Sequence, residues 1–136
     1  MVIGRRVRRP IALVMGVVVV GGLVAVGCGG GDDDNSSRYV EPKGPAAATI
    51  TIKASNFSFD PDKVTADAGV AKLELEDAGG IHTLVFDDGK VPGFQLEVTG
   101  DGTDAKKIDL KPGKYTFYCD ITGHRAQGMV GTLTVK

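Results

Sequence analysis

Residues 115–135 read YTFYCDITGHRAQGMVGTLTV, and this stretch decides the fold. Apolar and polar residues alternate at both of its ends, over 115–118 and 131–135. Alternation with a period of two is typical of a β-strand that has one buried face. The residues between the two ends include Gly123 and Gly128, which favour a loop because glycine adopts backbone angles that other residues avoid. The stretch therefore predicts a strand, a loop and a second strand.

The same alternation recurs in the preceding residues, so the whole region reads as β-structure. It is present at 49–53, 71–76 and 107–111, and further candidate strands lie at 81–86 and 94–98. No segment shows the 3.6-residue periodicity of a helix over three turns. Several short strands separated by glycine, proline and aspartate turns predict an all-β domain, built as an antiparallel sandwich or barrel.

The N-terminal residues have the pattern of an export signal. Four arginines lie within positions 5–9, and the uncharged, almost wholly apolar run 11–26 follows them. This run is shorter than the roughly 20 residues that a membrane span needs. The run ends at Gly27 and Cys28, which resemble a bacterial lipobox. We therefore expect residues 1–27 to be a lipoprotein signal peptide and Cys28 to be lipidated.

Other interpretations of these residues stay open. The segment could be an ordinary signal peptide or an uncleaved anchor, with Cys28 incidental, and the export route could be general or twin-arginine. In each case the protein is exported, and the lipid reading places it on the cell membrane, facing the periplasm or the cell exterior.

The following residues predict a tether and then one domain. Residues 28–46 are rich in glycine, serine, proline and acid, and such a stretch is expected to be flexible. Residues 47–136 hold the predicted strands. The whole chain of 136 residues has a formal net charge of −1, and loss of the four signal arginines leaves 12 basic and 17 acidic residues, a net −5. This balance argues against a nucleic-acid partner.

The scarce residues point to a metal site. Beyond residue 28 the sequence has one cysteine, Cys119, two histidines, His82 and His124, and one methionine, Met129. Imidazole, thiolate and a weak thioether form the ligand set of a type 1 copper site, because together they tolerate both copper oxidation states. Each residue alone is more often a packing or surface residue, and Cys119 could instead pair with another molecule. Taken together, their types and loop spacing favour a metal.

These residues also carry a family resemblance. Residues 115–135 resemble the copper loop of the cupredoxin superfamily of plastocyanin, azurin and rusticyanin, and 56–61 and 80–86 resemble its first strands and isolated histidine. The resemblance implies a Greek-key β-sandwich with one copper ion that cycles between Cu(I) and Cu(II). By the same resemblance, the three equatorial ligands are His82, Cys119 and His124. The axial ligand is Met129.

Three residues are candidates for contacts around the ligands. Thr83 stands where the family often has asparagine, and Asp120 stands where a small hydroxyl residue is common. With Ile121, these residues are expected to set the hydrogen bonds and packing around the metal. Replacements at such positions alter the reduction potential rather than remove a ligand.

The same resemblance predicts how electrons leave the protein. His124 is expected to reach the surface through an apolar patch, and His82 to be more buried. The candidates for that patch are Val91, Pro92 and Phe94.

The resulting hypothesis is a mononuclear type 1 copper electron-transfer protein, tethered outside the cytoplasmic membrane. The sequence has neither a Ser-His-Asp order nor a second set of metal ligands, so a catalytic function has no support. The expected partners are membrane-associated redox proteins, and the expected state is a monomer. The alternative is a copper-binding protein for copper delivery or storage, although the domain lacks the extra methionines and histidines of that class. A metal-free adhesion sandwich is a further alternative, and the complete ligand set argues against it.

Overall fold

The computed structural model describes residues 38–87 and 89–136. These residues form β-strands and a single 3-10 turn, η1, at Arg125–Gln127. Among them, no helix has the length and apolar character to cross a membrane. The strands are β1 Ala48–Ser55, β2 Ser58–Asp60, β3 Lys63–Ala66, β4 Gly69–Asp77, β5 Ile81–Phe86, β6 Gln95–Thr99, β7 Thr103–Leu110, β8 Gly113–Tyr118 and β9 Val130–Val135.

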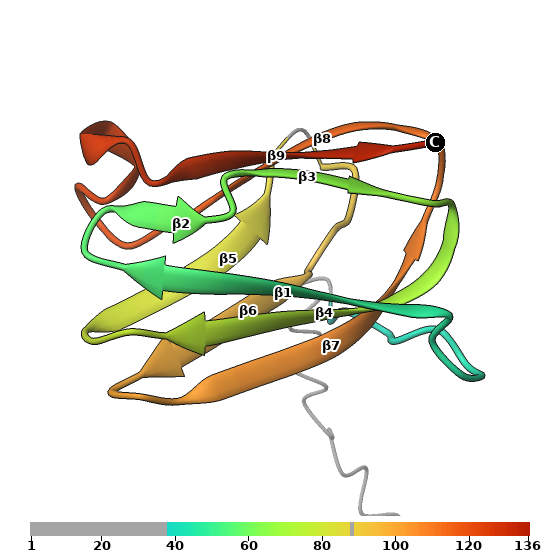
Figure 1. Cartoon of the computed structure of the whole chain (residues 1–136), viewed down its shortest axis with the longest axis horizontal. Coiled ribbons are helices and arrows are strands. Elements are labelled where there is room, and N and C mark those ends of the chain that lie inside the picture. The colour runs from blue at the N-terminus through green and yellow to red at the C-terminus, as the bar shows by residue number, and fades with distance from the viewer. Residues whose placement is uncertain (1–37, 88) are drawn as a thin grey trace, which may run out of the picture. The chain divides into compact units, whose positions relative to one another are not determined.

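The strands form two sheets, which build a β-sandwich (Figure 1). One sheet has four strands in the order β2-β1-β4-β7, and the other has five in the order β3-β9-β8-β5-β6. The predicted all-β sandwich is confirmed. The pairing is not wholly antiparallel, because β1 pairs with β4 and β3 pairs with β9 in parallel. Between β1 and β4 the chain crosses to the other sheet as β3, and such a crossover allows parallel neighbours.

The core lies between the sheets and follows the alternation of the strands. In β1 the buried residues are Ile50, Ile52 and Ala54, while the threonines and lysine between them are exposed. Each large apolar side chain that is buried in this way contributes about 1.5–3 kcal/mol. The largest buried apolar side chains are Ile52, Leu73, Leu75, Leu84, Leu96, Ile108, Leu110, Phe117, Met129 and Leu133.

Two strands, β2 and β3, are not detected by alternation in the sequence. They have three and four residues, which is too short for a period of two to stand out. Their place is set by long-range pairing instead. Lys53 of β1 pairs with Asp60, and Lys63 pairs with Thr132 of β9.

Residues 38–46 pack on the domain, although the sequence predicts them to be part of a flexible tether. The hydroxyl of Tyr39 donates to the carbonyl of Lys107 at 2.7 Å, and its ring meets the ring of Phe94 at a centroid distance of 4.9 Å. A carboxylate oxygen of Glu41 accepts the backbone N–H of Lys107 at 3.0 Å. One aromatic anchor and one acceptor thus cover the edge strand β7, and composition alone does not reveal them.

The expected signal peptide 1–27, the lipidation site Cys28 and the remainder of the tether lie outside the described residues.

The connections at one end of the sandwich lie on the left in Figure 1. They are the tip of the β1–β2 hairpin, the turns between β4 and β5 and between β6 and β7, and the loop between β8 and β9. Both sheets thus contribute to this end, and the scarce residues lie here.

Candidate metal centre

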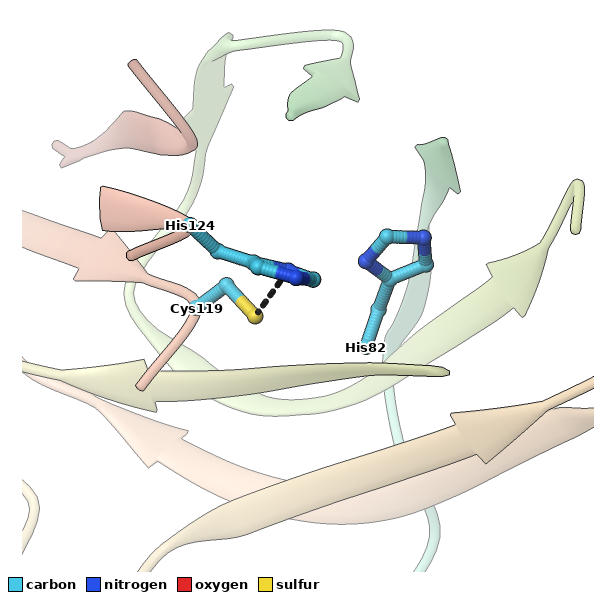
Figure 2. A group of neighbouring side chains, drawn as sticks. All are labelled: His82, Cys119 and His124. Atoms are coloured by element: carbon cyan, nitrogen blue, oxygen red, sulfur yellow. Dashed lines mark hydrogen bonds between the residues drawn. The ribbon is translucent and has the colours of Figure 1, made fainter. Parts of the chain in front are cut away.

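Three side chains converge at the loop end of the sandwich (Figure 2). His82 is the second residue of β5, Cys119 directly follows β8, and His124 directly precedes η1. One donor atom from each residue lies within 4.8 Å of the other two. The sulfur of Cys119 is 3.4 Å from Nδ1 of His124, and the two imidazole rings are 5.4 Å apart between centroids. The structure therefore brings together three of the four residues predicted to hold a metal.

His82 is fixed in an orientation that leaves one nitrogen for a ligand. Its side chain is fully buried, and Nε2 lies 3.2 Å from the carbonyl of Gly79. A carbonyl accepts only, so Nε2 carries the proton and Nδ1 keeps its lone pair. Nδ1 is buried and has no hydrogen-bond partner. An orphaned buried acceptor is costly, and a metal ion at this point would satisfy it.

Asp77 lies beside His82 and was not predicted from the sequence. Its Oδ1 accepts the backbone N–H of Gly79 at 3.0 Å and lies 3.8 Å from Nε2 of His82. Its Oδ2 is buried and has no hydrogen-bond partner. The signal that could have found it is the alternation of β4, because Leu73, Leu75 and Asp77 share the inward phase.

Thr83 and Asp120 join β5 to the loop, as their predicted place near the ligands requires. The hydroxyl of Thr83 donates to Oδ1 of Asp120 at 2.6 Å and accepts the backbone N–H of Asp120 at 3.0 Å. The backbone N–H of Thr83 also points at the buried sulfur of Cys119, at 3.5 Å. Donors of this kind stabilise a thiolate, which is the form of cysteine that binds metal.

The loop between β8 and β9 folds back on itself through backbone hydrogen bonds. The N–H of His124 donates to the carbonyl of Ile121 at 3.0 Å, and the N–H of Met129 donates to the carbonyl of His124 at 3.1 Å. Gly123 and Gly128 take φ angles of 86° and 100°, as predicted, and these are angles that favour glycine. Met129 is fully buried, and its carbonyl accepts the N–H of Cys119. The fourth predicted ligand thus closes the same loop.

His124 is half-buried, and an aromatic ring that the sequence did not single out covers one side of it. Phe57, at the tip of the β1–β2 hairpin, meets the imidazole edge-on at a centroid distance of 5.1 Å. Phe57 is 37% exposed and has a φ of 66°, a strained angle for a bulky side chain. Strain of this kind collects at functional sites.

The expected surface patch of Val91, Pro92 and Phe94 has no exposed aromatic ring. These residues lie between β5 and β6. Phe94 is only 3% exposed because its ring packs against Tyr39 and Phe86, so it offers no ring to a partner. The alternation of Phe94 with Leu96 and Val98, which are also buried, indicates an inward-facing side chain, so the sequence itself argues against Phe94 as a surface residue.

The donor set fits a single type 1 copper ion. Two imidazoles and a thiolate meet in a water-poor site, and the buried donor nitrogen of His82 has no other partner. A buried cysteine with a metal-coordinating geometry also explains a thiol that is neither exposed nor paired among the described residues.

Comparison with known proteins leads to the same metal. The model of the family "copper binding proteins, plastocyanin/azurin family" matches residues 46–136. Plastocyanin from Dryopteris crassirhizoma is 37% identical over 105 residues, which cover 67% of this chain and all of the relative. Plastocyanin from Nostoc punctiforme is 30% identical over 118 residues, which cover 74% of this chain and 84% of the relative.

A solved structure gives the same fold. Auracyanin B superimposes with a TM-score of 0.61 at 19% identity, over 74% of this chain and 96% of its own. At this level of identity the likeness bears on the fold alone, and it agrees with the β-sandwich.

Proposed function

Because the chain belongs to the plastocyanin/azurin family of copper-binding proteins, we propose that it carries single electrons between redox proteins. In this proposal His82, Cys119 and His124 are the equatorial ligands of one type 1 copper ion, and Met129 is the axial ligand. The observation that carries it is the meeting of the three donors within 4.8 Å, with Nδ1 of His82 buried and unpartnered. A copper ion bound there supplies a one-electron couple between Cu(I) and Cu(II).

The protein's part is to keep the ligands still while the charge of the site changes. His82 is held by the Gly79 carbonyl, Cys119 by the N–H of Thr83, and the loop by its backbone hydrogen bonds. Ligands that are fixed from outside need little rearrangement when an electron arrives or leaves.

Electrons leave and enter through the His124 side of the site. His124 is the half-exposed histidine, and its ring touches the exposed Phe57, whereas His82 is fully buried. The apolar contact surface of the proposal is therefore Phe57 with the exposed Ile81, in place of Val91, Pro92 and Phe94. An exposed apolar patch beside a buried redox centre suits brief contacts with a partner.

The proposal includes export and anchoring. Residues 1–27 are the signal peptide, Cys28 carries the lipid, and the glycine- and acid-rich segment after it tethers the domain on the outer side of the cell membrane. The partners are then redox proteins in or near the same membrane, and the domain works as a monomer. Mass spectrometry of the N-terminal peptide tests the lipid, and an unmodified Cys28 would contradict it.

Optical and paramagnetic spectra test the copper site. The full chain loaded with Cu(II) is expected to show an intense blue thiolate-to-copper band and a narrow copper hyperfine splitting. Cys119→Ser is expected to lose the blue band, whereas Met129→Leu keeps it and raises the reduction potential. A colourless wild-type complex, or a blue Cys119→Ser variant, contradicts the assignment.

Electron exchange separates a carrier from a copper store. A carrier passes electrons between its reduced and oxidised forms without releasing the metal. NMR line broadening in mixtures of the two forms measures this exchange. Rapid loss of copper to a chelator in both oxidation states, with no exchange, would instead support copper delivery or storage.

A further inference from the structure

The side chain of Arg125 makes two contacts outside its own loop. Its guanidinium lies over the ring of Tyr118, 3.9 Å from the ring centroid. One of its nitrogens also donates to Oδ2 of Asp87 at 2.5 Å. We call this arrangement of Asp87, Tyr118 and Arg125 the Arg125 bridge.

The Arg125 bridge joins the three segments that hold the site together. Arg125 directly follows His124, Tyr118 directly precedes Cys119, and Asp87 directly follows β5, the strand of His82. One side chain thus spans from the loop to both strands that carry the other donors, without touching the donors. The loop is tied at its start by Thr83 and Asp120, and the bridge ties it near its middle.

We propose that Arg125 is a positioning residue, which holds the loop and therefore His124 in place through Tyr118 and Asp87, whether or not copper is bound. The inference rests on the proposed function for the identity of the ligands. The contacts of the bridge involve none of the donor atoms of the site.

Arginine is suited to this task where lysine is not. Its flat guanidinium can stack on an aromatic ring and still donate from its edge to a carboxylate. The hydrogen bond that Arg125 donates to Asp87 raises the pKa of Arg125 above its ordinary value, so the guanidinium stays charged. Arg125 and Asp87 are 47% and 32% exposed, and an ion pair of that exposure contributes little by itself. Because Arg125 also stacks on Tyr118 and links the loop to two strands, we expect the bridge to restrict the motion of the loop rather than to raise the global stability.

The test uses the full chain with and without copper. Arg125→Gln removes the ion pair together with the stacked guanidinium, and Asp87→Asn removes the ion pair at an unchanged side-chain size. The matched control is Lys72→Gln, because the pair of Lys72 and Glu74 has a similar distance of 2.6 Å and similar exposures of 42% and 20% but lies on β4, outside the loop.

Three readouts are expected to move in both bridge variants and not in the control. Removal of copper by EDTA is expected to be about three- to tenfold faster. Amide exchange at Gln127 and Gly128 in the copper-free protein is expected to accelerate by a similar factor, because their N–H groups bond within the loop. The copper hyperfine splitting is expected to change as well. Global unfolding should shift no more than in Lys72→Gln.

A double variant and a conservative one complete the test. Arg125→Gln with Asp87→Asn should lose copper no faster than either single variant, since both act on one bridge. Arg125→Lys keeps the charge but not the flat guanidinium, so its rates of copper loss and loop amide exchange should lie between those of the wild type and Arg125→Gln. Loop exchange and copper release equal to those of Lys72→Gln would overturn the inference. If the wild-type protein binds no blue copper, the proposed function fails, and amide exchange in the copper-free loop still decides the bridge.

Discussion

The two histidines of the site are held in opposite ways. His82 lies within a strand, is fully buried, and is fixed from behind by Gly79 and Asp77. His124 lies in a loop, is half-buried, and is touched by the ring of Phe57 at the surface. The sheet thus makes one side of the site rigid, and the loop brings the other side to solvent. An electron-transfer site needs both properties. Fixed ligands limit the rearrangement of the metal site when an electron arrives, and an exposed ligand lets a partner protein come close to it.

The difference shows that the fold divides these tasks between its parts. His82 lies in β5, which pairs with β6 and β8, whereas the loop of His124 is held by short-range hydrogen bonds between 119 and 129. Changes on the His82 side should therefore disturb the metal and the fold together. Changes on the His124 side should alter electron exchange with little effect on the fold.

The largest expected effect comes from two neighbouring glycines on the His82 side. Gly79 and Gly80 have φ angles of 114° and 122°, so alanine at either position costs about 1–3 kcal/mol of stability. A Cβ at Gly79 meets open space, whereas a Cβ at Gly80 would lie 3.0 Å from Nε2 of His82. The buried ring cannot retreat, so Gly80→Ala is expected to cost about 1–3 kcal/mol more.

Denaturant unfolding and the copper spectrum of the two variants measure this difference. Gly80→Ala should also shift the blue band and the copper hyperfine splitting, while Gly79→Ala leaves both in place. Equal losses of stability with superimposable spectra would show that the His82 ring is not confined as the structure indicates.

The fold could be predicted from the sequence where alternation is long and failed where contacts are distant. Strands such as 49–53 and 71–76 follow from their period of two, as does the loop from Gly123 and Gly128. The short strands β2 and β3 and the packing of Tyr39 on Phe94 depend on partners far along the chain. No local pattern encodes them.

The same limit divides the site. Residue type and scarcity point to His82, Cys119 and His124, and the structure brings them together. Phe57 belongs to another connection, and only the folded arrangement brings it to His124, whereas Asp77 follows the inward phase of β4 and was open to prediction. Phe94 shows the opposite case, because its alternation with Leu96 and Val98 indicates a buried side chain, which cannot serve a surface patch.

The next effect concerns Thr83, which joins the two sides of the site. Thr83→Val keeps the shape of the side chain but removes the hydroxyl that accepts the N–H of Asp120 and donates to its carboxylate. Loss of these bonds at a buried position is expected to cost about 1–2 kcal/mol. The blue band should remain, because the backbone N–H of Thr83 still faces Cys119.

Thermal and denaturant unfolding with and without copper check this value. The control is Thr65→Val, an exposed threonine on β3, which should change stability by less than about 0.5 kcal/mol. If Thr83→Val and Thr65→Val behave alike, the Thr83–Asp120 link does not tie the loop to β5.

The smallest effect on stability is expected at Phe57, on the His124 side. Phe57→Gly relieves the strain of the left-handed angle but removes the edge contact with the imidazole, which is worth about 0.5–1.5 kcal/mol. The two changes nearly offset each other, so the free energy of unfolding should change by less than about 1 kcal/mol. Electron self-exchange, measured by NMR, should nevertheless slow about fivefold, the equivalent of about 1 kcal/mol in the encounter complex. Val40→Ser is the control, because Val40 is 83% exposed yet lies in the N-terminal segment. Equal exchange rates in the two variants would mean that the exposed ring beside His124 is not the contact through which electrons pass.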